Sequence, residues 1–232
     1  MGIDPKAGRS RYVQDIFTRV APRYDLMNRL MTGGMDVAWR RELIRRTALP
    51  RGGRLLDLGS GTGDIAAEAR RQHPDAAIFA GDFTLQMMRV GQGRFGDLRW
   101  AAADALNLPY PDASFDAVTS GFLLRNVVDL PRALSEQLRV LRPGGWLVAL
   151  DTTRPQPNLL SPFIRFHMRR VIPFLGTLLT GQRDAYTYLP ETSENFLKAE
   201  DLQARLDAAG FVQTGFVRRN FGTIAIHWGR RP

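Results

Sequence analysis

Three acidic side chains lie in or just after short apolar runs, where they could hold an organic ligand. Asp57 lies inside LLDLGSGTGD (55–64), Asp82 ends AIFAGD, and Asp104 follows RWAAA. Glycines after a strand let a ligand approach the backbone, and an acid that ends the next strand can accept hydrogen bonds from ribose hydroxyls. Asp104 and the N–H of Ala105 would then meet the edge of an adenine. The spacing predicts a nucleoside site at the ends of three strands.

The glycine turn departs from the dinucleotide pattern G-x-G-x-x-G, whose third glycine lets the helix pack closely on the strand. Gly59 and Gly61 fit this pattern, but Asp64 takes the third position. A carboxylate there would compete with a pyrophosphate for the N–H groups at the helix start. Taken singly, such a turn can be only a tight connection, and a strand-end acid only a helix cap. Together the signals favour a phosphate-free adenosine cofactor, S-adenosylmethionine. Its predicted contacts are Asp57, Gly59, Gly61, Thr62, Gly63, Asp82, Asp104 and Ala105.

A parallel sheet would bring these residues together. Runs typical of β-strands occur at 54–58, 77–81, 98–102, 115–120 and 146–150. Helical patterns lie between them at 65–71, 85–91 and 131–141, and the chain closes with a helix at 199–209 and an antiparallel hairpin of 211–217 with 223–228. This order predicts an α/β fold of the class I S-adenosylmethionine-dependent methyltransferase type, a doubly wound Rossmann-like sheet of seven strands whose last strand is antiparallel.

Composition sets further limits. The 232 residues, 44% of them hydrophobic, suit one core. The absence of cysteine excludes disulfides, thiolate metal sites and cysteine nucleophiles, and no metal site is predicted. The N-terminal stretch lacks an apolar core of signal-peptide length, and the longest apolar run, 171–179, is shorter than the roughly 20 residues of a spanning helix. We expect a cytoplasmic protein that is soluble or at most peripheral to a membrane.

The formal net charge of +9 is concentrated in two segments. Residues 1–51 hold eleven Lys and Arg against five Asp and Glu, and residues 152–183 hold five arginines and no acid. Basic surfaces of this kind can bind nucleic acid or anionic lipid head groups. The alternative is that they reflect only an arginine-rich composition. Because no RNA-binding motif accompanies them and lysine is almost absent, we predict no nucleic-acid partner but do predict peripheral contact with an anionic membrane. The sequence leaves the oligomeric state open, a homodimer included.

The fourth strand and the segment after it, FDAVTSGFLLRNVVD, limit the methyl acceptor. Methyltransferases that act on exocyclic base nitrogens or on glutamine typically have an Asn/Asp-Pro-Pro-Tyr/Phe turn at this place. No such turn occurs in this stretch. An amine acceptor is therefore disfavoured, which leaves oxygen or carbon.

Several stretches resemble the menaquinone/ubiquinone biosynthesis C-methyltransferases of the UbiE type over almost the whole chain. They are FTRVAPRYDLMNRLMTGGMDVAWRR (17–41), LLDLGSGTGD (55–64), LLRNVVDL (123–130), RVLRPGGWLVALDTTRP (139–155), DAYTYLPETSENF (184–196) and GTIAIHWG (222–229). The chain departs from the family pattern at Thr32 and Gly121, where serine is usual, and at Asp36, where histidine is usual. The cofactor contact of a serine at position 121 is therefore not expected.

The resemblance implies methylation of a ring carbon of a polyprenyl quinol, demethylmenaquinol to menaquinol, with S-adenosylhomocysteine as the second product. A benzoquinol of ubiquinone synthesis, or another small-molecule C- or O-acceptor, is the alternative. Because a phenol has a pKa near ~10, the site must favour the phenolate. Arg125 would stabilise this charge, since its guanidinium stays protonated, and Asn126 would hold the other quinol oxygen.

We expect one methyltransferase domain, 1–232. Its parts are a helical lid (1–50), a cofactor-binding core (51–151), a substrate-covering insertion (152–198) and a C-terminal helix and hairpin (199–232). In the lid, the spacing places Tyr24 and Asn28 on one helical face, which would lie over the bound cofactor and substrate. The alternative is an ordinary helix with Tyr24 packed inward and Asp25 as its cap. Within the insertion, 159–180 is either a buried cover or an interfacial anchor. His227 is expected to be packed rather than catalytic.

Overall fold

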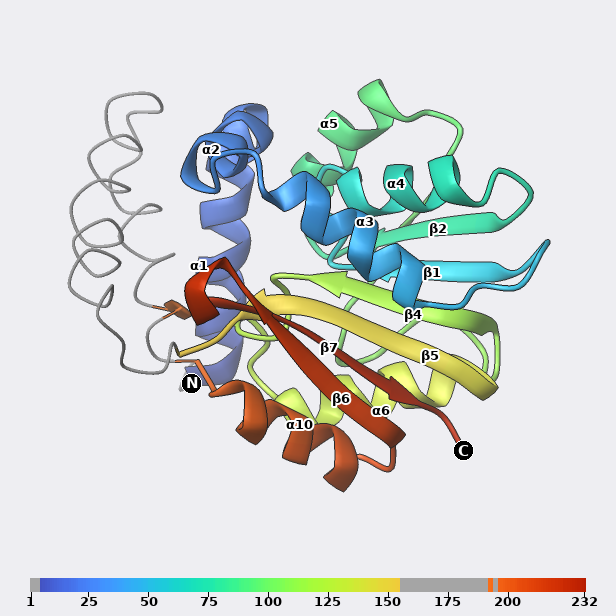
Figure 1. The fold of residues 1–232 in the computed structure, drawn as a ribbon. Helices are drawn as coiled ribbons and strands as arrows, with labels where there is room; N and C mark the ends of the chain where they lie inside the picture. Colours follow the sequence, from blue (N-terminus) through green and yellow to red (C-terminus); the bar gives the residue numbers. More distant parts are fainter. Residues whose placement is uncertain (1–4, 155–191, 194–195) are drawn as a thin grey trace.

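The computed structural model describes residues 5–154, 192–193 and 196–232. Within them, seven strands form one sheet in the order β3-β2-β1-β4-β5-β7-β6 (Figure 1). Neighbours among β1 to β5 are parallel, whereas β7 is antiparallel to both β5 and β6. The predicted seven-stranded sheet with an antiparallel last strand is confirmed. The strands are β1 (Arg54–Leu58), β2 (Ala77–Asp82), β3 (Arg99–Ala102), β4 (Phe115–Gly121), β5 (Leu141–Thr152), β6 (Val212–Arg219) and β7 (Ile224–Arg230).

Helices cover both faces of the sheet, which is why the central strands are apolar on both sides. In Figure 1, α3 and α4 lie over one face and α6 and α10 over the other. The first pair packs in one buried cluster with Leu55 and Val148, and the second packs in another with Leu56 and Leu147. The core helices are α4 (Asp64–Gln72), α5 (Leu85–Arg94), α6 (Leu130–Val140) and α10 (Ala199–Ala208), close to their predicted ranges.

The fifth strand is longer than the 146–150 predicted. It begins at Leu141, which pairs with Phe115, and its register then shifts so that Trp146 pairs with Ala117. Gly144 has φ of +82°, a left-handed conformation that glycine adopts without steric cost. The sequence RPGG suggests a turn, but here it forms an irregular start to the strand.

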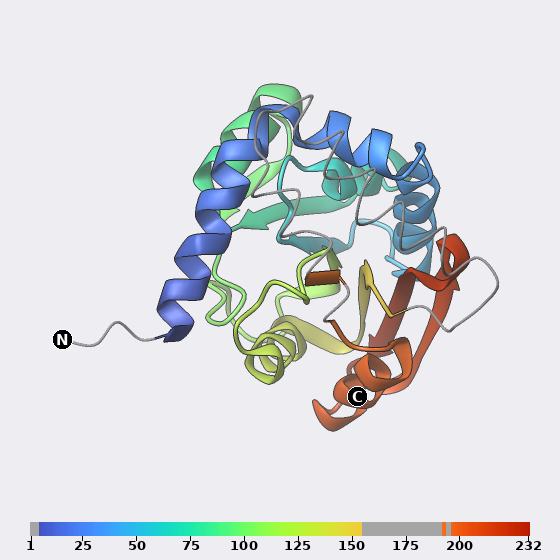
Figure 2. The same ribbon diagram turned by 90° about the vertical axis from the view of Figure 1, so that its left-hand side faces the viewer.

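The N-terminal residues form α1 (Pro5–Val20), the 3-10 turn η1 (Ala21–Arg23), α2 (Tyr24–Met31) and α3 (Asp36–Arg46). In Figure 1, α1 stands beside the carboxyl ends of the parallel strands, and Figure 2 looks onto this edge. Met27 of α2 is buried with Ile16 and Val20 of α1, so the two helices share a small core. The lid helices therefore lie at the edge of the sheet where the predicted site residues gather.

Most of the predicted insertion, including 159–180, lies outside the described residues. Within the described ranges, no helix is both long and apolar enough to cross a bilayer. The 3-10 turn η3 (Asn220–Gly222) connects β6 to β7.

Candidate active site

A cavity of about 190 Å³ opens at the carboxyl ends of β1, β2 and β4. Its wall is formed by the turn after β1, the end of β2, the loop after β3, the segment after β4, and one face of α1 with Tyr24. Seven of the predicted site residues lie in this wall: Tyr24, Gly59, Gly61, Asp82, Asp104, Ala105 and Asn126. The fold thus brings residues that are as far apart in the sequence as Tyr24 and Asn126 to the wall of one cavity.

Asp82 is fixed in the wall by the backbone. One carboxylate oxygen accepts a hydrogen bond from the N–H of Gly61 (2.7 Å), and the other accepts one from the N–H of Thr84 (2.6 Å). Burial raises the pKa of Asp82, and these two hydrogen bonds oppose the rise. The Thr84 side chain and the N–H of Phe83 also hydrogen-bond this carboxylate. Because Asp82 lies in the cavity wall, it is placed to meet the two neighbouring hydroxyls of a ribose.

Three residues predicted as cofactor contacts lie behind the wall. Asp57 is fully buried, and it accepts hydrogen bonds from Thr119 Oγ1 (3.0 Å) and the N–H of Ala66 (3.1 Å). Burial raises its pKa to about 7. Thr62 is also buried, and a Cβ at Gly63 would lie 2.7 Å from the Trp100 ring. These residues support the glycine turn from its far side.

Asp64 does not act as predicted. Its carboxylate accepts hydrogen bonds from Arg40 (2.5 Å) and Arg94 (3.0 Å), so it is engaged by guanidinium groups rather than by the helix N–H groups. The cavity wall gives a different reason for excluding a diphosphate. It contains the carboxylates of Asp82 and Asp104, and its described residues include no Lys or Arg. Such a wall attracts a cation such as a sulfonium and repels phosphates, so it fits S-adenosylmethionine.

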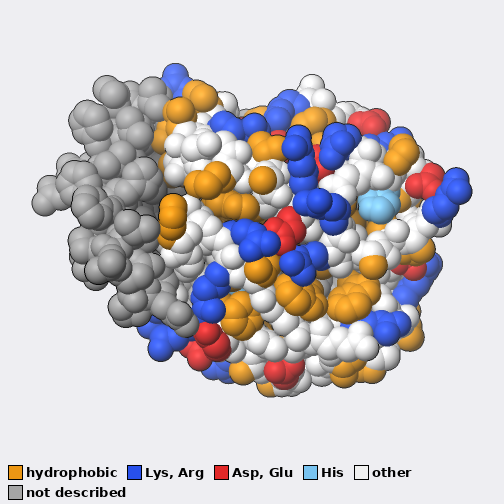
Figure 3. Space-filling model, viewed as in Figure 1, with side chains coloured by type: hydrophobic (Ala, Val, Ile, Leu, Met, Phe, Trp, Pro, Cys, Tyr) orange, Lys and Arg blue, Asp and Glu red, His pale blue; other side chains and the backbone are white. Residues whose placement is uncertain are grey.

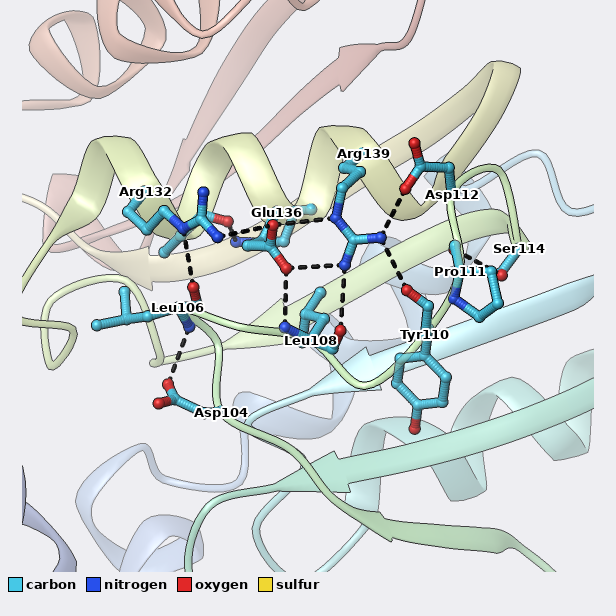
Figure 4. A network of polar contacts seen from close by, with 12 residues as sticks. Asp104, Leu106, Leu108, Tyr110, Pro111, Asp112, Ser114, Arg132, Glu136 and Arg139 are labelled. Carbon is cyan, nitrogen blue, oxygen red and sulfur yellow. Dashed lines mark hydrogen bonds and ion pairs between the residues drawn. The ribbon is translucent and has the colours of Figure 1, made fainter.

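The loop that carries Asp104 is held on α6 by a polar network (Figure 4). Arg132 Nε donates to the carbonyl of Leu106 (2.9 Å), and Glu136 accepts from the N–H of Leu108 (2.8 Å). Asp104 itself accepts from the N–H of Leu106 (2.9 Å). Because Glu136 is buried and paired, the loop has little freedom to move Asp104 away from the cavity.

Arg125 and Asn126 face different spaces. Asn126 lies in the wall of the first cavity, whereas Arg125 lines a second cavity of about 510 Å³, and Val127 borders both. The Arg125 guanidinium pairs with the buried Asp151 (Nη1 to Oδ1, 2.9 Å) and lies 4.7 Å from the centre of the Phe122 ring. Its buried Nε has no hydrogen-bond partner among the described residues.

Tyr24 lies close enough to Arg125 to be affected by its positive charge. Burial raises the pKa of Tyr24, while a hydrogen bond with Asn28 and the positive charge of Arg125 oppose this rise. The shared face predicted for Tyr24 and Asn28 is therefore present. Asp25 is not a helix cap, because it accepts a hydrogen bond from Thr62 Oγ1 (2.5 Å), and the residue at the cap position makes no side-chain cap.

His227 is buried in β7, and its Nε2 lies 3.0 Å from the carbonyl oxygen of Ala199. Burial lowers its pKa to about 4. The predicted packed histidine is confirmed. Among the described residues, no group of three or more His, Cys, Asp or Glu is arranged to hold a metal ion.

Sequence reasoning missed Asp151 and the arginines that pair near the site. Asp151 follows the apolar run LVAL, so the rule that selected Asp82 as a strand-end acid would also have selected it. Arg40 and Asp64 are 24 positions apart in the sequence, and Arg94 and Asp64 are 30 positions apart. No local sequence pattern indicates ion pairs over such separations.

The sheet order and the carboxylate-lined cavity define the class of protein, a class I S-adenosylmethionine-dependent methyltransferase. Solved structures of other methyltransferases share the fold. A possible histamine N-methyltransferase of Thermotoga maritima has a TM-score of 0.69 at 19% identity, over 94% of this chain and 99% of that one. Phosphoethanolamine N-methyltransferase 2 of Haemonchus contortus, in complex with S-adenosylmethionine, has a TM-score of 0.63 at 16% identity, over 84% of this chain and 52% of that one.

Sequence comparison identifies the family. The model of the ubiE/COQ5 methyltransferase family matches residues 6–231, and the chain belongs to this family. The ubiquinone/menaquinone biosynthesis C-methyltransferase UbiE of Desulfotalea psychrophila is 44% identical over 94% of this chain and 89% of that protein. The demethylmenaquinone methyltransferase of Thermus thermophilus is 42% identical over 94% of this chain and 100% of that protein. The protein is a methyltransferase that uses S-adenosylmethionine.

Proposed function

We propose that this protein methylates a ring carbon of a polyprenyl quinol, converting demethylmenaquinol to menaquinol. The observation that carries this proposal is the pair of cavities that meet at Val127, one with carboxylates in its wall and the other lined by apolar residues together with arginines such as Arg125. The names of relatives at 42% and 44% identity support the same substrate class. The division into lid, core, insertion and C-terminal hairpin is part of this proposal, with the lid helices and the core jointly enclosing the reaction.

Both cavities take part in the proposed arrangement of the substrate. The quinol ring lies in the first cavity between Tyr24 and Asn126, near the cofactor held by Asp82 and Asp104. The prenyl tail leaves through the second cavity, where Leu130, Phe196 and Leu197 supply an apolar wall. Val127 lines both spaces, so a ring and its tail can occupy them without a break.

The residues of the chain favour the phenolate and orient the ring. When bound, S-adenosylmethionine supplies an electrophilic methyl group that passes to the ring carbon with loss of a ring proton and release of S-adenosylhomocysteine. Arg125 lines the adjoining cavity, and its positive charge stabilises the phenolate from there. Asp151 holds this guanidinium in place. Asn126 fixes the second oxygen, and Tyr24 closes the other side of the ring, so catalysis rests mainly on positioning.

The test uses methyl-labelled S-adenosylmethionine with reduced demethylmenaquinone and, separately, a reduced demethoxyubiquinone analogue. We expect label in the naphthoquinol, and label in the benzoquinol alone would assign the ubiquinone-pathway substrate. Tyr24→Phe should lower turnover about tenfold, while cofactor affinity measured by calorimetry stays within about twofold. Tyr110→Phe is the matched control, because the Tyr110 hydroxyl is buried without a partner among the described residues. Cofactor binding without label in either quinol would refute the proposed substrate class.

We also propose that the chain meets an anionic bilayer through the lid. Leu26, Leu30 and Met35 are large hydrophobic residues 42% to 55% exposed, and the exposed Arg23 and Arg29 flank them. Figure 3 shows hydrophobic and basic side chains intermixed on this part of the surface. An apolar face with arginines at its rim suits a membrane interface, where each arginine contributes about 1 kcal/mol on anionic lipid.

Flotation with lipid vesicles tests this contact. We expect the protein to float with phosphatidylglycerol vesicles and not with phosphatidylcholine vesicles. Leu26→Ser with Leu30→Ser should reduce flotation severalfold. Val212→Ser removes an exposed hydrophobic residue from β6, away from the lid, and should have no effect. Equal flotation of both variants would contradict a membrane contact through α2.

A further inference from the structure

Five charged side chains from four helices form one chain of alternating sign beneath the lid. Arg40 of α3 pairs with Asp36 of the same helix (3.0 Å) and with Asp64 at the start of α4 (2.5 Å). Arg94 at the end of α5 pairs with Asp64 (3.0 Å) and also with Asp25 of α2. These ion pairs therefore join α2 and α3 of the lid to α4 and α5 of the core.

The outer end of this chain reaches the glycine turn itself. The second carboxylate oxygen of Asp25 accepts a hydrogen bond from Thr62 Oγ1 (2.5 Å). Thr62 follows Gly61, whose N–H binds Asp82 in the cavity wall. On the lid side, Asp25 directly follows Tyr24, which lines the same cavity. A single carboxylate thus connects the lid to the turn that holds the cofactor.

The two halves of the chain differ in exposure. The Arg40 and Asp64 side chains are only 10% and 13% exposed, so this half of the network is largely buried and is little screened by salt. The Arg94 and Asp25 side chains are 39% and 24% exposed. A pair in contact with solvent is weaker and is screened by salt. The Arg40–Asp64 pair should therefore stay formed, whereas the Arg94–Asp25 pair can break and re-form.

We infer that Asp25, Thr62 and Arg94 are positioning residues that form a latch between α2 and the glycine turn. With the latch closed, Tyr24 stays at the cavity wall and the lid retards exchange of S-adenosylmethionine and S-adenosylhomocysteine. With the latch open, α2 can leave the turn while Arg40 keeps α3 attached to α4. The inference rests on the cofactor site and not on the identity of the quinol.

Arg94→Gln tests the latch, and Arg89→Gln is its matched control. Arg89 is an exposed arginine on the same helix for which the described structure shows no ion pair. In Arg94→Gln we expect the dissociation of S-adenosylhomocysteine, followed by stopped flow, to be about two- to fivefold faster, the range typical of one solvent-accessible ion pair. Hydrogen exchange of residues 24–31 should increase in the same variant. Arg94→Lys should restore both, and Arg89→Gln should match the parent protein.

Salt gives a second readout that a purely structural role would not change. Dissociation from the parent protein should accelerate between 0.05 M and 1 M salt, since the outer pair is screened, and dissociation from Arg94→Gln should respond much less. Thr62→Val tests the uncharged side of the latch and should also increase exchange of residues 24–31. Equal dissociation rates and salt responses in the two glutamine variants would overturn the latch. Because neither readout uses a quinol, this result is separate from failure to methylate one.

Discussion

Gly121 closes β4 and lines the cofactor cavity at a position where the family pattern usually has serine. Its φ lies outside the left-handed region, so the backbone would accept a side chain. Space is the obstacle, because a Cβ at position 121 would lie 2.4 Å from Cδ1 of Ile65, whereas ordinary contacts are 3.4–4 Å. Ile65 on α4 is itself buried and packs in the core. We therefore predict that Gly121 and Ile65 are a coupled pair.

The magnitudes follow from packing energetics. Gly121→Ser forces Ile65 to shift in a filled core, which costs about 1–3 kcal/mol of unfolding free energy. Ile65→Val alone removes Cδ1 and costs about 0.5–1.5 kcal/mol. In the double variant the clashing methyl group is absent, so the total should be close to that of Ile65→Val. The coupling energy between the two sites is then about 1–3 kcal/mol.

Urea unfolding of the parent protein, both single variants and the double variant measures this coupling. Calorimetry with S-adenosylmethionine adds a functional readout, because Gly121 lines the cavity. We expect the serine variant to bind the cofactor less tightly and the double variant to recover part of the affinity. If the two substitutions are additive within about 0.5 kcal/mol, the reasoning from the 2.4 Å contact is wrong.

Three further predictions concern buried ionisable groups. Asp82→Asn should weaken S-adenosylmethionine binding about tenfold or more by calorimetry, because an amide cannot accept at both of its ends; unchanged affinity would count against its role. Asp151→Asn should lower the free energy of urea unfolding by about 3–5 kcal/mol, since it leaves the Arg125 guanidinium buried without its partner, and an added Arg125→Met should recover part of this loss. The pKa of His227 falls from 6.5 to about 4 on folding, so as pH drops through this window only the unfolded chain gains its proton. Stability should fall by about 3 kcal/mol between pH 7 and 4, and His227→Gln should remove this part of the loss, whereas an unchanged pH profile would contradict it.

The strands were predictable where both faces of the sheet are covered. The run RLLDL of β1 has four buried residues, and such continuous apolar runs between glycines are the strongest local signal of a central parallel strand. The first part of β5 was not predictable, because RPGG matches a turn and its strand character comes from pairing with Phe115, which is distant in sequence. Non-local pairing overrides local preference there.

The motif located the site but not the direction of each side chain. Gly59 and Gly61 border the cavity, whereas Thr62 and Gly63 of the same turn face α2 and Trp100. Gly59, Gly61 and Gly63 all have positive φ, so the direction in which each residue of the turn faces depends on backbone angles that sequence spacing does not give. Asp64 shows the same limit. The sequence shows an acid at the start of a helix, but it does not show that two arginines from other helices pair with this acid.

Those partners explain how an arginine-rich chain with a net charge of +9 can bind a cationic cofactor. Three arginines that lie around Tyr24 and Asp25 do not carry unpaired charge. Arg40 and Arg94 are paired with carboxylates, and so is Arg125. A single unpaired guanidinium at about 10 Å would oppose a sulfonium by roughly 1–2 kcal/mol at an effective dielectric constant near 20. Pairing therefore preserves the negative wall of Asp82 and Asp104, and the remaining positive charge stays on the outer surface, where it can meet anionic lipid.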